Sequence, residues 1–345
     1  MVRVLGVPVL AMVLVQIAYS VMNLMYKLAV EDGMNMRVLV AYRAFFAAAF
    51  MAPLALLIER KRLPKLSRVI LYQAFLCGLL GITLSQNLYI EGLALTSATF
   101  AVVMTNLNPA FTLVFAICFG MEKLKVETRA GKAKVVGTVV GMGGAMLSTL
   151  YTGIQIPIST AHLHRHQTPH RHVAASHASF VTHLFGSLFA LSSSAFYALW
   201  LIAQGKMNES YPYYYSSTAL VTAMGFAQSL IVGLCTERDW DQWRLGFNIR
   251  LLSAAYSGIV TSGVVIALIS WCVSKKGPLF VSSFNPLAIV VIAIAGCLVL
   301  DEKLHLGSIL GATLIVCGLY MVLWGKSKET KYTTEAVSPE APSTT

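Results

Sequence analysis

The sequence predicts an all-α integral membrane protein in which ten transmembrane helices form two inverted five-helix repeats. The composition supports this class, because 57% of the 345 residues are hydrophobic and 12% are charged, whereas a soluble domain carries about 25% charged residues. Apolar segments of about 20 residues, the length of one membrane crossing, recur along the chain. These features exclude a soluble enzyme, a disulfide-linked secreted module and a disordered protein.

Ten spans follow from the apolar runs and from the charged residues between them. They are residues 9–29, 38–58, 69–90, 97–119, 134–151, 183–204, 213–235, 250–272, 278–300 and 307–324. Residues 1–151 then form a first repeat and residues 183–324 a second. Between the repeats, residues 152–182 form a non-cytoplasmic loop with six of the eight histidines, and residues 325–345 form a disordered cytoplasmic tail because they are polar and rich in Ser, Thr, Pro and Glu.

The distribution of basic residues predicts the orientation in the membrane. With the N-terminus inside, 17 of the 26 Lys and Arg residues fall on the cytoplasmic side and 7 on the opposite side, as the positive-inside rule requires. An even number of spans places both termini in the cytoplasm. Because ten of the basic residues form two five-residue runs between apolar segments, where they signal topology, we exclude nucleic acid as a partner.

The two halves of the chain resemble each other. Residues 81–118, shifted by 177 positions onto 258–295, give nine identities, which include Gly81 with Gly258 and the Asn-Pro pair at 108–109 with that at 285–286. Each repeat has an odd number of spans, so the second copy enters the membrane from the opposite side. This arrangement is an inverted-topology repeat, which is common among secondary transporters.

The repeated Asn-Pro pair predicts a break in mid-membrane. A proline within a helix cannot donate a backbone hydrogen bond, so the carbonyl groups of Thr105 and Ser282 lose their helical partners. In hydrocarbon these groups need a side chain, a water molecule or a substrate instead. One interpretation is a packing kink with local hydroxyl bonds, and the one we favour is a substrate site at the midplane. Its candidate residues are Thr105, Asn108, Pro109, Ser282, Asn285 and Pro286.

Other polar residues within the spans are candidates for a substrate pathway. Gln16 and Asn23 lie in the first span, Gln86 in the third and Trp200 in the sixth. Interhelical hydrogen bonds explain such residues as well. Arg43 lies inside the second span, where an unpaired cation is costly. It either binds a substrate carboxylate or braces the helices.

No Asp or Glu lies deep within any of the spans. Glu122 and Glu302 each begin a Glu-Lys-Leu sequence after an Asn-Pro span, and they form either interfacial ion pairs or gates. Proton-coupled carriers usually keep ionisable groups within the membrane. The lack of such carboxylates favours facilitated movement down a gradient.

We expect no metal, no cofactor and no enzymatic activity. The histidines of the 152–182 loop lack a fixed scaffold and Cys partners, and the six cysteines lie within or at the ends of apolar stretches without a C-x-x-C pair. Motifs for ATP binding, zinc hydrolysis or a nucleophilic serine are absent from the sequence.

Several segments resemble the walls-are-thin-related transporters of plants, also called nodulin-21-like or UMAMIT proteins. The matching segments are MTNLNPAFT, MEKL and KVVGTVVGMGGAML in the first half, and GPLFVSSFNPL and LDEKLHLGSILGATLIVCGLYMVLWGKSKE in the second. The resemblance covers nearly all of residues 9–330. It implies two EamA-type repeats of the drug/metabolite transporter superfamily, with ten helices in two inverted halves.

The resemblance also implies a function and a location. Members move amino acids in either direction across the plasma membrane or the vacuolar membrane, and one branch exports auxin from the vacuole. We therefore expect a bidirectional facilitator of amino acids or related small solutes. The alternatives are a carrier of auxin or another aromatic acid, and a receptor or scaffold without transport. Expected partners are the small-molecule substrate and the lipid bilayer, with a homodimer as an open alternative to a monomer.

Overall fold

The apolar runs of the sequence form helices almost throughout the computed structural model. The structure describes residues 2–59, 66–96, 98–122, 127–151, 155–156, 180–300 and 304–337. The helices of the first half are α1 (Val2–Glu31), α2 (Met36–Glu59), α3 (Arg68–Cys77), η1 (Gly78–Leu84), α4 (Ser85–Leu95), α5 (Ala98–Thr105), α6 (Asn108–Cys118) and α7 (Arg129–Leu150). Those of the second half are α8 (Phe180–Ser210), α9 (Tyr214–Thr236), η2 (Trp240–Trp243), α10 (Ile249–Tyr256), η3 (Ser257–Val265), α11 (Ile266–Lys276), α12 (Pro278–Ser282), α13 (Leu287–Leu300) and α14 (Leu306–Val337).

The protein is an all-helical, multi-pass membrane protein. Eight helical segments of the described chain are long and apolar enough to cross a membrane. Two shorter apolar segments, Val102–Cys118 and Pro278–Ile294, coincide with the expected fourth and ninth spans. Both are interrupted near the Asn-Pro pair. The strands β1 (Gln155–Ile156) and β2 (Leu304–His305) pair in antiparallel fashion and join the two interhelical connections that contain them.

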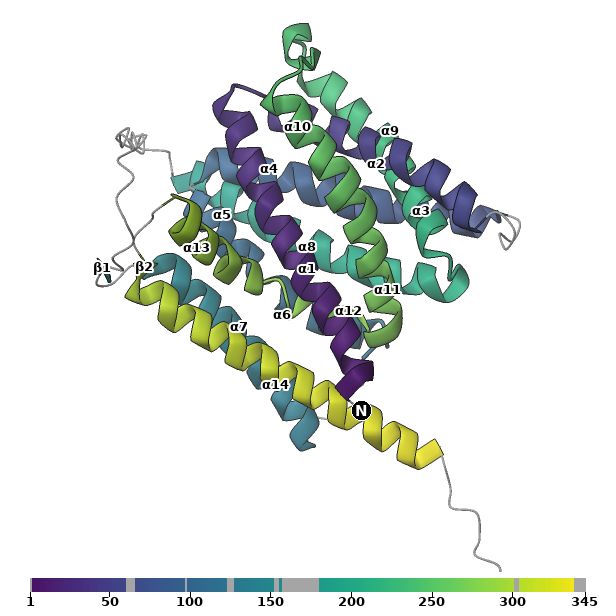
Figure 1. Ribbon diagram of the computed structural model, residues 1–345, viewed down its shortest axis with the longest axis vertical. Coiled ribbons are helices and arrows are strands. Elements are labelled where there is room, and N and C mark those ends of the chain that lie inside the picture. Colours follow the sequence, from purple (N-terminus) through teal and green to yellow (C-terminus); the bar gives the residue numbers. More distant parts are fainter. Residues whose placement is uncertain are drawn as a thin grey trace, which may run out of the picture.

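Helices from the two halves pack against each other in a reciprocal pattern (Figure 1). Helix α7 lies along α14, and α2 lies along α9. Helix α1 packs against α10 and α11, while α8 packs against α3 and α4. The broken helices follow the same pattern, because α13 contacts α1 whereas α5 and α6 contact α8.

Glycines bring α7 and α14 into close contact. A β-carbon at Gly137 would lie 2.7 Å from the carbonyl oxygen of Gly318, and one at Gly144 would lie 2.8 Å from that of Gly311. Such spacing requires the absence of side chains, as in G-x-x-x-G helix pairs of membranes. The close approach of these two helices therefore depends on their glycines.

Two long helices contain a π-helical segment in the middle. The segment η1 interrupts the α3–α4 helix, and η3 interrupts the α10–α11 helix. The repeat identities Gly81/Gly258 and Ile82/Ile259 fall within these segments. π-Helical turns are rare and occur often at functional sites. Sequence periodicity did not predict them.

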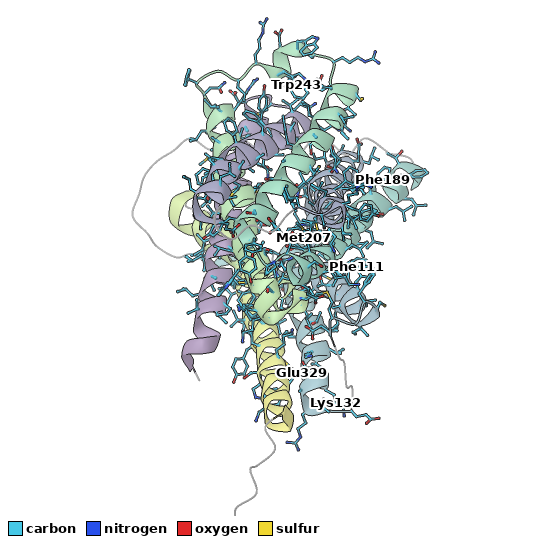
Figure 2. All side chains as sticks on the ribbon, turned by 90° about the vertical axis from the view of Figure 1, so that its right-hand side faces the viewer. Phe111, Lys132, Phe189, Met207, Trp243 and Glu329 are labelled. Atoms are coloured by element: carbon cyan, nitrogen blue, oxygen red, sulfur yellow. The ribbon has the colours of Figure 1, made fainter. Side chains whose placement is uncertain are left out.

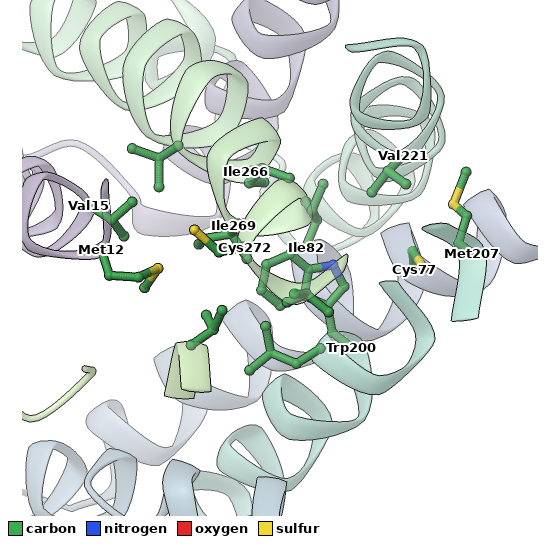
Figure 3. Packing of buried hydrophobic residues seen from close by; sticks show 14 of the residues in the cluster. Met12, Val15, Cys77, Ile82, Trp200, Met207, Val221, Ile266, Ile269 and Cys272 are labelled. Carbon is green, nitrogen blue, oxygen red and sulfur yellow. The ribbon is translucent and has the colours of Figure 1, made fainter. Parts of the chain in front are cut away.

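Buried side chains from both halves form a shared core (Figure 3). Met12 and Val15 of α1 and Ile82 of η1 come from the first half. Trp200 of α8 and Ile269 of α11 come from the second half. The halves are thus two parts of one packed unit.

Polar contacts join the halves at both ends of the bundle. At one end, which we call the Asp32 end, Oδ2 of Asp32 lies 2.7 Å from Nε of Arg250. At the opposite end, the Glu122 end, Glu122 contacts Lys134 and Lys326. Figure 2 shows these ends far apart, with Trp243 at the Asp32 end and Glu329 at the other.

The expected disordered tail is wrong for residues 325–337. Helix α14 continues without interruption from Leu306 to Val337, so the polar segment extends the last apolar helix. Lys326 and Glu329 on this extension contact residues of the first half, and these contacts stabilise the extra turns. Residues 338–345 and most of the histidine-rich loop lie outside the described residues.

Candidate functional site

Both Asn-Pro pairs lie at breaks between helices, as the sequence predicts. Helix α5 ends at Thr105 and α6 begins at Asn108, with Pro109 in its first turn. In the second half, α12 ends at Ser282 and α13 begins at Leu287. Proline is compatible with the first turn of a helix because the N–H groups there have no helical acceptor.

The two breaks face one shared space rather than opposite sides of the protein. Pro109 and Pro286 are both buried, and both line a small cavity together with Thr138 of α7, Ser283 and Gly318 of α14. The cavity volume is about 10 Å³, which is enough for one water molecule. In this conformation the space is too small for an amino acid.

Local hydrogen bonds satisfy part of the polar groups at the breaks. The hydroxyl of Thr105 donates to the carbonyl of Val102 at 2.8 Å, and that of Ser282 donates to the carbonyl of Leu279 at 3.2 Å. The carbonyl of Ser282, which we expected to be released, accepts the N–H of Asn285 at 3.0 Å. A packing kink with local hydrogen bonds therefore explains the hydroxyl groups of Thr105 and Ser282.

Asn108 differs from these residues. Its side chain is buried, and its Oδ1 has no hydrogen-bond partner among the described residues. A buried polar atom without a partner costs about 1–3 kcal/mol. Such an atom at a helix break, next to the cavity-lining Pro109, is suited to accept a hydrogen bond from a solute or a water molecule.

Arg43 is buried and bonded to neutral hydroxyl groups. Its Nε donates to Oγ of Ser262 in η3, and its Nη1 donates to the hydroxyl of Tyr26 in α1 at 3.2 Å. The residue as a whole is 7% exposed. Within the described ranges, no carboxylate lies within 4.0 Å of it.

A chain of polar groups links Arg43 to the second helix break. Tyr19 of α1 lies within electrostatic reach of Arg43 and of Tyr26. Tyr197 of α8 lies within reach of Tyr19 and forms a side-chain hydrogen bond with Asn285. We call this set the Arg43 network; its members are Tyr19, Tyr26, Arg43, Tyr197, Ser262 and Asn285. It crosses from η3 and α2 through α1 and α8 to the turn after α12.

The other candidate residues lie in different surroundings. Gln16 and Trp200 are buried, and Nε2 of Gln16 and Nε1 of Trp200 have no partner among the described residues. The Trp200 ring packs against Tyr197 with 5.5 Å between centroids. Gln86 is half-buried, and Asn23 is exposed. The structure therefore does not bring Asn23 into the buried polar set.

Glu122 belongs to a buried cluster of charges at the Glu122 end. Its Oε2 lies 3.1 Å from Nζ of Lys134, and its Oε1 contacts Nζ of Lys326. Lys326 also donates to the carbonyl of Lys276 at 2.6 Å, and Lys134 contacts Glu329. We call Glu122, Lys134, Lys326 and Glu329 the four-charge cluster. The other gating candidate, Glu302, lies outside the described residues.

The loop between α11 and α12 packs directly onto this cluster. Gly277 adopts φ = 83°, which favours glycine. A β-carbon there would lie 3.1 Å from both Oε1 of Glu122 and Nζ of Lys326. The cluster therefore connects α7 and the end of α6 in the first half to α14 and the start of α12 in the second.

Sequence reasoning missed part of the site. Tyr26 and Tyr197 were not selected, although Tyr19 and Tyr26 are seven residues apart and so share one face of α1. Lys134 and Lys326 were counted as topology signals, yet Lys134 is fully buried. The spacing on α1 was a usable signal, whereas the partners of the lysines depend on packing between distant segments.

Broken membrane helices that meet between two halves are features of membrane transporters. The comparisons agree with this class. Residues 7–150 and 184–324 match the EamA-like transporter family. Two WAT1-related proteins of Arabidopsis thaliana are 42% and 43% identical over 325 and 324 residues, which is 94% and 93% of this chain and 90% of each relative.

The chain belongs to the EamA-like transporter family, within its WAT1-related group. A crystal structure with 15% sequence identity superposes with a TM-score of 0.67, covering 94% of this chain and 99% of the other. This likeness concerns the fold alone.

Proposed function

We propose that this protein is a bidirectional facilitator that carries amino acids or related small solutes across a membrane by alternating access. The observation that carries the proposal is the meeting of the two helix breaks: Pro109 and Pro286, equivalent positions of the repeat, line the same cavity. In inverted-repeat transporters, substrate sites lie at the repeat interface and are formed by discontinuous helices.

The reciprocal helix pairing supports ten spans in two inverted halves. In the repeat, α1 is equivalent to α8, and the α3–α4 helix is equivalent to the α10–α11 helix. The contact of α1 with α10 and α11 therefore corresponds to the contact of α8 with α3 and α4. Helices α7 and α14 pair with each other, as do α2 and α9, in agreement with a pseudo-twofold axis. The two interrupted segments then count as the fourth and ninth spans.

The contacts at both ends suggest how access alternates. The four-charge cluster closes the Glu122 end across the halves, and the Asp32–Arg250 pair joins the halves at the opposite end. With one water-sized cavity between them, the described conformation is closed around the breaks. Release of one set of contacts would open a path from that side. The basic residues of the connections support a cytoplasmic location for the Glu122 end.

A specific observation favours the second candidate substrate class, auxin or another aromatic acid. Tyr197 interacts with Asn285 at the second break, and its ring packs against that of Trp200. Aromatic pairs bind flat apolar groups well. A non-transporting receptor or scaffold is the alternative from another class.

Uptake and efflux of labelled amino acids and of indole-3-acetic acid, measured in oocytes, separate these functions. We expect flux in both directions that persists when the proton gradient is dissipated. Asn108→Ala should abolish most of the flux without loss of surface protein, because its buried Oδ1 is poised for a ligand. Asn248→Ala, at an exposed position, is the matched control. Absence of flux for every solute, with the protein at the surface, would favour the receptor.

A further inference from the structure

We propose that Arg43 is the anion receptor of the transport site and binds the carboxylate group of the solute. This inference rests on the proposed transport function and specifies its substrate class: small carboxylic acids. Arg43 is buried in the second helix, and its two hydrogen bonds go to the neutral hydroxyls of Ser262 and Tyr26. The positive charge is thus oriented without being neutralised by a carboxylate of the described residues.

The free-energy cost of burying a cation within a membrane span requires an explanation. A charged side chain within a membrane span is rare and usually pairs with an opposite charge. Arg presents a planar fork that matches a carboxylate in bidentate geometry. Ser262 and Tyr26 hold Nε and Nη1, so the fork is fixed in direction before a ligand arrives. Fixed direction reduces the ordering cost of binding.

Packing between helices does not require an arginine at this position. A β-carbon at Gly258 of η3 would lie 2.7 Å from the carbonyl oxygen of Arg43 and 3.2 Å from the backbone nitrogen of Ala47. In the other half, a β-carbon at Gly78 of η1 would lie 3.0 Å from the carbonyl oxygen of Val221 and 2.9 Å from the nitrogen of Gly225.

The two contacts have the same form. In each, a glycine of a π-helical segment packs on the carbonyl of one residue and the nitrogen four residues later, in α2 or in α9. The residue at the first of these positions is Arg43 in one half and the fully buried Val221 in the other. Because these contacts use backbone atoms and one of them is made at the apolar Val221, the close approach of the helices does not account for the charge of Arg43.

The polar groups around Arg43 extend toward the helix break. Tyr19 lies within electrostatic reach of Arg43, and Tyr197 lies within reach of both Tyr19 and Asn285. A solute with its carboxylate at Arg43 would have its remaining part directed along these rings toward Asn285. This placement suits an amino acid or an aromatic acid, and it disfavours amines and neutral sugars.

The test compares an acid with its uncharged amide. Binding of indole-3-acetate and indole-3-acetamide, and of N-acetylphenylalanine and its amide, is measured on the purified full-length protein in detergent by calorimetry. Both acids carry an aromatic ring, and the second pair adds an acylated amino-acid backbone, so the comparison shows whether that backbone affects binding. The wild type should bind at least one acid about 10-fold more tightly than its amide, because a hydrogen bond to a charged group exceeds a neutral one by about this factor.

Arg43→Gln should remove this preference by weakening acid binding while leaving amide binding within about threefold. Arg43→Lys keeps the charge but loses the fork, and it should retain part of the preference. Tyr26→Phe, which removes one hydroxyl that orients the fork, should weaken acid binding by a smaller factor and serves as the milder variant if Arg43→Gln fails to fold. Arg244→Gln, which changes an arginine with an exposed side chain, is the matched control and should keep the full preference.

Two results would overturn the inference. One is equal binding of acid and amide by the wild type, and the other is an unchanged preference in Arg43→Gln or in both milder variants. The flux assay keeps this failure separate from that of the proposed function. A protein that transports acid and amide equally well is still a carrier, whereas one that transports no solute contradicts the carrier itself.

Discussion

Substitution of Glu122 by Gln tests whether the four-charge cluster acts as a gate. The side chain of Glu122 is 5% exposed and contacts Lys134 and Lys326 from different helices. Removing one partner of a buried ion pair costs about 3–5 kcal/mol. Lys134 keeps Glu329, and Lys326 keeps the carbonyl of Lys276, so the lower end of this range applies.

This cost has a different consequence for a gate than for a static brace. If the cluster forms only when the Glu122 end is closed, the loss of about 3 kcal/mol falls on the closed state alone. The ratio of open to closed protein then rises about 100-fold, since 1.4 kcal/mol corresponds to a factor of ten. If the cluster is present in every conformation, the whole fold loses stability and the ratio stays constant.

A cysteine at Thr138 reports the state of this end. Thr138 is buried, lies one turn beyond Lys134 on α7, and lines the cavity of the two prolines. In a background without other cysteines, a membrane-impermeant thiol reagent applied at the Glu122 end should label Thr138→Cys slowly. Addition of Glu122→Gln should raise the labelling rate by one to two orders of magnitude if the starting population is largely closed.

Asp241→Asn is the control, because Asp241 is an exposed carboxylate whose partner Arg244 is also exposed. It should leave the labelling rate unchanged. An unchanged rate in Glu122→Gln, together with a lower unfolding temperature, would refute the gate and show a brace instead.

Two further substitutions test the contacts that hold the halves together. Gly318→Leu should lower the unfolding temperature measured in detergent by several degrees or prevent folding, because a β-carbon at Gly318 already meets the backbone of α7; Gly143→Leu, at a position with open space, should have little effect, and equal effects of the two would contradict the glycine interface. Arg250→Glu should reduce solute exchange by placing two negative charges together at the Asp32 end, and the double variant with Asp32→Arg should restore it. Failure of the exchanged pair to restore flux would mean that these residues act separately.

The helices and their breaks were predictable because they depend on local properties. Apolar length determines which segments enter the membrane, and a proline ends or interrupts a helix wherever it lies. The Asn-Pro breaks at residues 108–109 and 285–286 followed from these rules. The partners of each polar side chain did not follow, since they depend on which distant segments pack together. Burial of Lys134 and the contact of Arg43 with Ser262 are of this kind.

The end of the last helix shows the same difference between what local sequence properties predict and what packing between distant segments determines. Its composition from residue 325 onward is polar, and local reasoning therefore predicted a disordered tail. In the structure, Lys326 and Glu329 contact Glu122 and Lys134 of the first half. Long-range ion pairs stabilise helical turns that the composition alone would not maintain. A polar segment that alternates Lys and Glu directly after an apolar span was the available signal.

Equivalent residues of the repeat have acquired different roles, and this difference locates the chemistry. Ser85 and Ser262 occupy the same repeat position. The hydroxyl of Ser85 and the carbonyl of Ser193 are joined by a bond of 3.2 Å, and the hydroxyl of Ser193 donates to the carbonyl of Ser85 at 2.7 Å. These reciprocal bonds join α4 to α8, whereas Ser262 accepts a hydrogen bond from Arg43. The two equivalent serines therefore have different partners: Ser85 joins two helices through backbone carbonyls, whereas Ser262 orients the buried Arg43, whose proposed role in binding a solute has no counterpart at Ser85.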